Sequence, residues 1–231
     1  MSVTSPQRSR KASARRADVA ALAIGVVVLG AASAAAAGPV TTAETQIFRG
    51  VNNLPQGLNP FIWPLMQYGT FITIPLLSLV AVGFRRYRAA IVMATSGIAV
   101  YLIARAVKLA VERPRPAALL TGVNEREVFG EGSLGFPSGH ASVAAALAFT
   151  CAMFFGALWF RIGVALAIIV SIGRLYVGAH LPLDVVGGAA LGIIAGSVAH
   201  LLIGLPHVRE SLPDDAGPPV DEAPPAGDMD R

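Results

Sequence analysis

Long apolar segments separated by short polar ones set the pattern of this chain. Six segments are each about 17–24 residues long, the length that an α-helix needs to cross about 30 Å of hydrocarbon. They lie at residues 18–37, 62–84, 89–111, 139–160, 162–178 and 184–204. The pattern therefore predicts an all-α integral membrane protein with a six-helix bundle, and it contains no internal repeat.

The first apolar segment allows two interpretations. Basic residues precede it, and the small residues at 31–34 resemble the cleavage site of a secretory signal peptide. Its apolar core, however, extends from Val19 to Ala37. That is longer than the apolar region of about 7–15 residues in a usual signal peptide. We therefore expect a retained helix, with cleavage as the alternative.

The composition agrees with a membrane location. Hydrophobic residues make up 54% of the chain and charged residues only 14%, whereas a soluble domain carries about 25% charged residues. The length suits one membrane domain with short tails. The single cysteine, Cys151, lies in an apolar segment, so the chain cannot form an internal disulfide. No group of Cys and His has the spacing of a zinc site.

The two ends of the chain differ in charge. Residues 1–17 carry five basic and no acidic side chains, whereas residues 206–231 carry seven acidic and two basic ones. The second of these segments is also rich in Pro and Gly, so we expect a basic tail, a membrane domain over residues 18–205 and an acidic, disordered tail. Basic residues flank the spans instead of forming one patch, which argues against nucleic acid and favours membrane lipids as partners.

The Lys and Arg residues of the short loops predict the orientation. The basic N-terminal tail, three arginines in residues 85–88, and Arg161 fall on one side of the membrane if the six spans alternate. We assign this side to the cytoplasm, together with both termini. The loops at residues 38–61, 112–138 and 179–183 then lie outside.

The first of these outer loops carries a short amphipathic pattern. Ile47, Phe48, Val51 and Leu54 recur at nearly helical spacing, with polar residues such as Glu44 between and beside them. The pattern predicts either a short helix at the membrane interface or a linker packed on the bundle.

Three short polar motifs stand at the edges of the apolar segments on the outer side. The first consists of Lys108 and, seven residues later, Arg115 followed by Pro116. Two helical turns put the cations on one face, and a proline on each side of Arg115 favours an extended backbone there. Cations at a helix end often only extend toward the headgroups, so this motif alone leaves both a functional and a structural interpretation open.

The second motif, Pro137-Ser138-Gly139-His140, precedes the fourth span. Ser138 is a favourable N-cap, and Gly139 allows the backbone to approach a ligand closely. Free N–H groups at a helix start bind phosphate oxygens, and His140 would stand beside such an anion. An ordinary helix start with an interfacial histidine would give the same pattern.

The third motif places Arg174 near the outer end of the fifth span, His180 in a short loop and Asp184 at the start of the sixth span. A carboxylate beside an imidazole fixes the tautomer of the ring and raises its basicity, and histidine can act as a covalent nucleophile. The structural alternative for Asp184 is a helix cap. Three cations and two histidines together predict a phosphate site.

In this order the three motifs resemble those of the type 2 phosphatidic acid phosphatase superfamily. These are membrane lipid phosphate phosphatases whose site is related to that of vanadium haloperoxidases. The resemblance extends over roughly residues 60–205. One departure is Gly173, where the family usually has a serine, and we expect this change to tune the site without abolishing function.

The resemblance implies a role for each motif residue. His180 would form a phosphohistidine, Asp184 would orient it, and His140 would protonate the leaving oxygen. The phosphate would be bound by Lys108, Arg115, Arg174, Ser138 and the Gly139 amide. No metal or cofactor is implied, because three cations and a helix N-terminus supply the positive charge that phosphoryl transfer needs. The sequence also lacks an Asp/Glu cluster suited to magnesium.

The expected function is hydrolysis of a lipid phosphate or diphosphate at the outer face of a plasma membrane, bacterial by its high Ala, Gly and Arg content. Polyprenyl diphosphate, phosphatidic acid and phosphatidylglycerol phosphate are the candidate substrates. One alternative is a transporter or flippase that binds such a lipid without cleaving it, which would predict an inverted repeat. A haloperoxidase-like oxidation with bound vanadate is the other, and six spans argue against it because the related enzymes are soluble.

Overall fold

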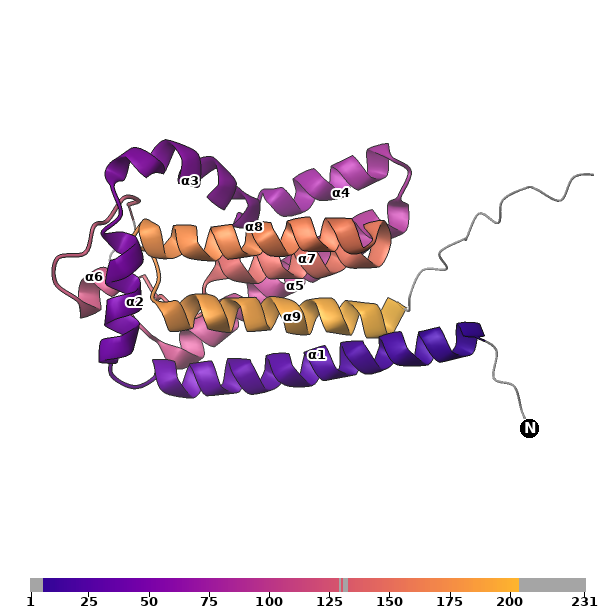
Figure 1. Ribbon diagram of the computed structural model, residues 1–231, viewed down its shortest axis with the longest axis horizontal. Helices are drawn as coiled ribbons and strands as arrows, with labels where there is room; N and C mark the ends of the chain where they lie inside the picture. Colours follow the sequence, from indigo (N-terminus) through magenta and orange to yellow (C-terminus); the bar gives the residue numbers. More distant parts are fainter. Residues whose placement is uncertain (1–5, 129, 131–132, 204–231) are drawn as a thin grey trace, which may run out of the picture.

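The computed structural model describes residues 6–128, 130 and 133–203, and the described part of the chain is helical apart from its loops (Figure 1). The α-helices are α1 Pro6–Ala36, α2 Thr42–Asn52, α3 Asn59–Met66, α4 Thr73–Gly83, α5 Tyr87–Val111, α6 Pro116–Leu119, α7 Gly139–Phe155, α8 Ala157–Tyr176 and α9 Pro182–Ile203, with two 3-10 turns, η1 Gln56–Leu58 and η2 Gln67–Gly69. The all-α prediction is confirmed. The predicted acidic tail, residues 206–231, lies outside the described residues.

Four of the described helices are long and apolar enough to cross a membrane: Ser13–Ala36 within α1, and the whole of α5, α8 and α9. A fifth candidate is the pair formed by residues 56–69 and α4, which is bent by 70°. The remaining apolar helix, α7, has 17 residues and falls short of a usual span. The described residues thus give four or five candidate spans, and the predicted number of six is not confirmed.

The bend interrupts the predicted span at residues 62–84, and local hydrogen bonds account for it. The hydroxyl groups of Thr70 and Thr73 both donate to the carbonyl of Gln67, at 2.7 and 2.8 Å. These bonds satisfy the carbonyl where the helix stops, so the chain can turn without leaving it unpaired. Gly69, at the bend, packs so closely on α7 that a Cβ atom there would lie 2.6 Å from the His140 carbonyl oxygen.

The boundary between the predicted fourth and fifth spans is also displaced. We expected it at Arg161, but α7 ends at Phe155 and α8 begins at Ala157. The residue between them, Gly156, has φ +86°, a conformation that favours glycine and ends α7. The polar residue that suggested the boundary therefore lies inside α8, and the glycine is the actual break.

Helix α7 lies in the middle of the bundle, and glycines bring its neighbours close to it. A Cβ atom on Gly192 of α9 would lie 2.5 Å from both the Ala145 Cβ and the Ser142 carbonyl oxygen of α7. On the other side, one on Gly163 of α8 would lie 2.8 Å from the Ala148 Cα. Small residues at the contact allow membrane helices to approach each other closely. Close packing matters there because the burial of apolar surface contributes little to helix association within a bilayer.

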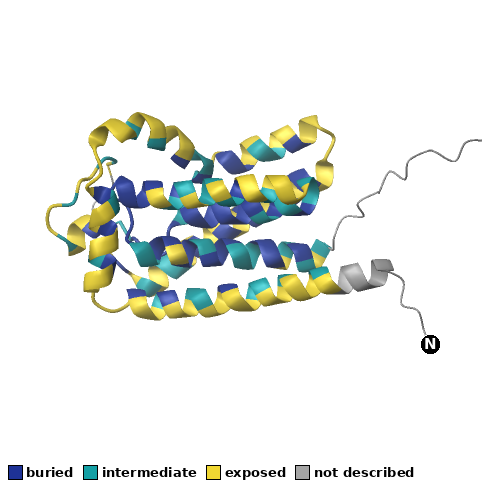
Figure 2. Ribbon diagram, viewed as in Figure 1, coloured by how far each residue is buried: buried dark blue, intermediate teal, exposed yellow. Residues whose placement is uncertain are grey.

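Exposed residues lie on the outer faces of the bundle and buried ones toward its centre (Figure 2). Many of the exposed residues are large and apolar, and the buried ones are mostly apolar with some polar side chains among them. Ile24, Leu79 and Ile91, for example, are 60%, 67% and 63% exposed. Ser142 and Thr150 of α7 are fully buried, and each donates its hydroxyl hydrogen to a backbone carbonyl of the preceding turn. This distribution is the one expected for helices that face lipid.

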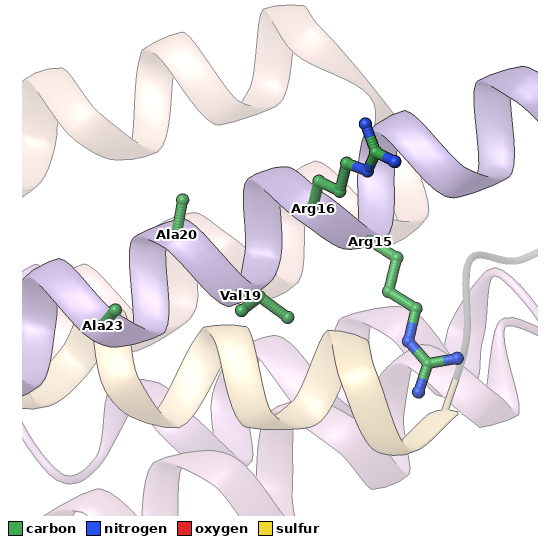
Figure 3. Close-up of a pocket in the computed structure, with 5 residues that line it drawn as sticks. All are labelled: Arg15, Arg16, Val19, Ala20 and Ala23. Carbon is green, nitrogen blue, oxygen red and sulfur yellow. The ribbon is translucent and has the colours of Figure 1, made fainter.

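The two ends of the bundle differ in character (Figure 1). The start of α1 and the end of α9 lie at one end, and α2 and α6 lie at the other. A hollow at the first end is lined by Arg15, Arg16, Val19, Ala20 and Ala23 of α1 (Figure 3). None of the motif residues lines it, because they all lie at the end with α2 and α6.

Candidate active site

The three motifs converge at one end of the bundle although they come from helices α5 to α9 and from the segments between them. Lys108 lies in the last turn of α5, Ser138 is the N-cap of α7, and Arg174 lies in the last turn of α8. Lys108, Arg115 and Arg174 all lie within electrostatic range of both His140 and His180. The structure thus brings the predicted site residues together.

His180 lies at the centre of this group. It is 2% exposed, and its Nδ1 atom lies 3.5 Å from Oδ2 of Asp184, which is fully buried at the start of α9. Burial, followed by the charges of Arg174, Lys108 and Arg115, holds the pKa of His180 well below its usual range, against a smaller opposite effect of the Gly135 carbonyl. The ring is therefore neutral at pH 7, the form that a nucleophile requires.

Each of the three cations is held in place by a contact to another segment. Lys108 Nζ donates to the carbonyl oxygens of Leu134 and Gly135 at 3.0 and 2.9 Å. Arg115 donates to the Ser133 hydroxyl and to the Ala179 carbonyl at 2.7 and 2.9 Å. These bonds tie the first motif to the loops that carry the second and the third.

Arg115 and Arg174 lie close enough to affect each other. Burial, and after it the charge of Arg174, lowers the pKa of Arg115 to about 10, so it stays protonated at neutral pH. Arg174 donates to the carboxylate of Glu127 at 2.5 Å and to the sulfur of Met66 at 3.6 Å. A dianion placed among these cations would relieve their mutual repulsion.

The start of α7 has the form expected of an anion site. The Ser138 hydroxyl accepts a hydrogen bond from the Ala141 N–H at 3.4 Å. The backbone N–H of Ser138 donates to the Asp184 carbonyl at 2.8 Å. The peptide bond between Phe136 and Pro137 is cis. Apart from its chain neighbours and the backbone of its own helix, no described residue lies within 4 Å of a Cβ placed on Gly139. The space beside the first N–H groups of the helix is therefore open to a ligand.

The position of Gly173 explains how the chain accommodates its departure from the usual family serine. A Cβ atom there would lie 3.2 Å from Ile62 and 3.4 Å from Met66, both on α3. The side chains of α3 thus occupy the space that a larger residue would need, and Met66 reaches the guanidinium of Arg174.

Two charged residues that lie outside the three motifs, Arg113 and Glu44, are directly behind the site. Arg113 donates to Asp184 Oδ1 at 3.0 Å, and it contacts both carboxylate oxygens of Glu44 at 3.0 and 2.7 Å. All three side chains are buried. The repeated Arg-Pro pair at residues 113–116 was a signal for Arg113 in the sequence, but nothing in the pattern distinguished Glu44 from the polar face of its helix.

Of the two interpretations of the pattern near Glu44, the structure shows the short helix, because α2 packs Phe48 into the bundle. The C-terminal end of α2 also anchors the loop before the second motif. Asn52 donates to the Asn124 carbonyl and accepts from its N–H, at 3.0 and 2.9 Å. Arg126 lies over the Tyr176 ring, 4.1 Å from its centre, and donates to the Tyr176 carbonyl. Glu127 is thereby placed next to Arg174.

Known proteins are similar to this chain in sequence and in fold. An undecaprenyl-diphosphatase of Sulfolobus acidocaldarius is 28% identical over 151 residues, which cover 64% of this chain and 73% of that protein. Aquifex aeolicus LpxE, known from a crystal structure, is 26% identical to this chain with a TM-score of 0.63. The match covers 69% of this chain and 95% of the LpxE chain. A PAP2-type phosphatidylglycerolphosphate phosphatase from Bacillus subtilis shares the fold at 21% identity, with a TM-score of 0.64 and coverage of 80% and 95%.

The sequence profile of the PAP2 superfamily matches residues 87–205, which is more than half of the chain. The matched segment runs from α5 to the end of α9 and includes all three motifs. The resemblance seen in the motifs is therefore confirmed over the whole of this part of the bundle, and the chain belongs to the PAP2 superfamily, the type 2 phosphatidic acid phosphatases.

Proposed function

We propose that this protein hydrolyses a lipid phosphate monoester or diphosphate through a phosphohistidine on His180. One observation carries the proposal: the buried imidazole of His180 lies 3.5 Å from the Asp184 carboxylate, within range of three cations. A neutral histidine among cations serves no obvious packing purpose, but it is suited to attack a bound phosphate. Relatives named for the hydrolysis of lipid phosphates support the substrate class.

The mechanism assigns a role to each residue. Lys108, Arg115 and Arg174 bind the non-bridging phosphate oxygens, together with the N–H groups at the start of α7 and the Ser138 hydroxyl. The Nε2 atom of His180 attacks phosphorus, because Nδ1 faces Asp184, and the bond to the leaving oxygen breaks. His140 donates a proton to that oxygen. The leaving lipid alcohol or lipid monophosphate therefore carries one negative charge less than it would without this proton.

The second half of the reaction restores the enzyme. His140, now neutral, takes a proton from a water molecule as the water attacks the phosphorus of the phosphohistidine. The bond from phosphorus to Nε2 breaks, and inorganic phosphate leaves. Asp184 stabilises the positive charge that the His180 ring carries while it is phosphorylated. Lys108, Arg115 and Arg174 neutralise the negative charge of the phosphoryl group. On this basis we propose that no metal ion takes part.

The bundle supports a lipid substrate. Apolar residues cover the outer faces of the helices that carry the motifs, so the site lies at the boundary between an apolar surface and the loops. We propose that the phosphate head of a membrane lipid enters the site while its tail stays in the bilayer. Polyprenyl diphosphate, phosphatidic acid and phosphatidylglycerol phosphate are the candidates.

We further propose that α1, the bent pair with α4, α5, α7, α8 and α9 form six spans, with both termini in the cytoplasm. The exposed arginines 85, 86, 88 and 161 support this orientation. In a Cys151→Ser background, Val128→Cys in the outer loop should react with an impermeant thiol reagent in intact cells. Phe84→Cys, after α4, should react only once the cells are permeabilised. The reverse pattern would invert the orientation.

The function is tested by phosphate release from a panel of lipids in detergent with EDTA present. Purified protein should release inorganic phosphate from at least one of the three candidates, and His180→Ala should abolish the release. A soluble phosphate ester such as glycerol phosphate is the control for lipid selectivity. Lipid binding without release would favour a transporter, and release that requires added magnesium would contradict the assigned electrostatics.

A further inference from the structure

A chain of buried charges leads from the candidate nucleophile to the helix α2. Oδ2 of Asp184 faces His180 and accepts a hydrogen bond from the Leu181 N–H at 2.8 Å. Oδ1 of the same carboxylate accepts from Arg113 Nη1 at 3.0 Å. Arg113 then forms a two-pronged contact with Glu44, whose exposed fraction is only 5%. The two carboxylates are thus joined through one guanidinium.

Glu44 has a second contact that fixes its position relative to the motif. Its Oε1 atom accepts a hydrogen bond from the Leu183 N–H at 3.1 Å, in the first turn of α9. Asp184 in the same turn bonds back to the Leu181 N–H. The carboxylates of Glu44 and Asp184 therefore accept hydrogen bonds from N–H groups at the start of α9. Their negative charge also interacts favourably with the positive end of the helix dipole. The loop that carries His180 is held at its downstream end by both.

The charges along this chain alternate in sign. Burial alone would lower the pKa of Arg113, but its hydrogen bond to Glu44 and the charges of Asp184 and Glu44 outweigh this effect and raise it. A buried charge without a partner is strongly unfavourable, so each member depends on its neighbour. With two carboxylates and one guanidinium, the group keeps one net negative charge next to His180, and without Glu44 it would be neutral.

We propose, on the basis of the function assigned above, that Glu44 and Arg113 are positioning residues for the nucleophile. Glu44 binds Arg113 so that the Asp184 carboxylate stays oriented toward His180 and keeps its negative charge undiminished. This charge stabilises the ring when Nε2 carries the phosphoryl group. The outer helix α2 is thereby part of the catalytic apparatus, although none of its residues touches the substrate.

The matched variants are Glu44→Gln and, as control, Glu112→Gln. Glutamine keeps the length of Glu44 and can still accept a bond from Arg113, but it removes the charge. Glu112 lies next to Arg113 in sequence and is exposed, so its substitution makes the same chemical change outside the network. Glu44→Gln should lower kcat about 10- to 100-fold, the fold-change that corresponds to the contribution of a hydrogen bond between charged groups, with KM within about twofold. Glu112→Gln should leave both unchanged.

A double-mutant cycle distinguishes positioning from a general loss of structure. If Glu44 acts through Asp184, Glu44→Gln should lower kcat no further in an Asp184→Asn background. A structural defect that inactivates part of the protein would instead lower kcat by the same factor in both backgrounds. Arg113→Lys provides a second variant if Glu44→Gln folds poorly, because lysine keeps the charge but cannot bridge the two carboxylates. Arg105→Lys, at an exposed position of α5, is its control.

Binding of vanadate and of inorganic phosphate tests the inference without turnover. Vanadate forms a fifth bond to a nucleophile, whereas phosphate needs only the cations. Glu44→Gln should therefore weaken vanadate binding about tenfold and leave phosphate binding within about twofold, measured by the shift in melting temperature of the detergent-solubilised protein. Equal effects on both anions, or none on vanadate, would overturn the inference. Wild-type protein that binds vanadate but releases no phosphate from any lipid would contradict the proposed function alone, and protein that binds no vanadate would contradict both.

Discussion

The carboxylate of Glu127 lies 2.5 Å from Nη1 of Arg174, inside the group of cations that we assign to the substrate phosphate. Its side chain is one-third exposed, so it lies at the mouth of the group, and Arg126 and Asn124 anchor the loop that carries it. A carboxylate in this position occupies one of the contacts that a phosphate oxygen would make. We therefore expect a bound phosphate to compete with Glu127 for Arg174.

Glu127→Gln should strengthen the binding of phosphate, because the amide competes less well than a carboxylate for Arg174. We expect the inhibition constant for inorganic phosphate to fall about 2- to 5-fold, the effect of one partly exposed ion pair. Glu125→Gln, two residues away and exposed, is the matched control and should change nothing. Weaker phosphate binding by Glu127→Gln would mean that Glu127 holds Arg174 in its active position instead.

His140→Ala should affect substrates according to their leaving groups. A general acid contributes about 10²–10⁴-fold when the leaving oxygen needs a proton. The variant should therefore lose much of its activity on a lipid monophosphate and less on nitrophenyl phosphate or a diphosphate, whose leaving groups are more acidic. Arg115→Gln should lower the rates on all of them alike. Equal losses for His140→Ala across these substrates, with chemistry rate-limiting, would remove His140 from the acid role.

The low pKa of His180 predicts a dependence of stability on pH. The folded pKa lies below the ordinary value of 6.5, so the unfolded chain binds more protons as the pH falls below 6.5. The contribution of this group to the free energy of unfolding is present above pH 6.5. It is lost as the pH falls toward the folded pKa, by at most about 1.4 kcal/mol per pH unit. Without phosphate, the melting temperature of wild-type protein should drop more between pH 7 and pH 5 than that of His180→Gln. Equal drops would mean that His180 takes up a proton as readily when folded.

The close packing of α7 against α9 predicts that alanine is not tolerated at Gly192. Its Cβ atom would meet the backbone of α7 at 2.5 Å, and backbone cannot move aside as a flexible side chain can. Gly192→Ala should therefore destabilise the protein by about 1–3 kcal/mol, as overpacking does. Gly30→Ala in α1, where the added atom meets no described residue within 4 Å, should be neutral or slightly stabilising. Thermal unfolding in detergent compares the two, and a stable Gly192→Ala would show that the helices are less tightly packed.

The sequence was most informative where one residue type has one physical role. Apolar length identified the helices, and the spacing of Arg174, His180 and Asp184 placed them together because a short loop joins two antiparallel helices. The bend near Thr70 was missed because the apolar run continues through it, while the hydroxyl groups that end the helix count as neutral in such a pattern. The break at Gly156 was missed because Arg161 seemed the stronger boundary.

The contribution of Glu44 to the site could not have been predicted from local pattern. It lies 69 residues from Arg113 and 139 from Leu183, its two partners, and on its own helix it resembles an ordinary polar residue. Only the packing of α2 against the start of α9 turns it inward. Such contacts depend on tertiary structure, whereas the three motifs are defined by spacing within one or two helical turns.

The phosphorylated residue is the most direct test of the account. Protein mixed with a lipid substrate labelled in the phosphoryl group, and quenched in alkali within one turnover, should carry label on His180 and none in the His180→Ala variant. Phosphohistidine survives alkali and is lost in acid, which distinguishes it from a phosphoserine at Ser138. Label on His180 would support attack by this residue at the centre of the three cations. Label on His140, or release of phosphate by His180→Ala at the wild-type rate, would contradict it.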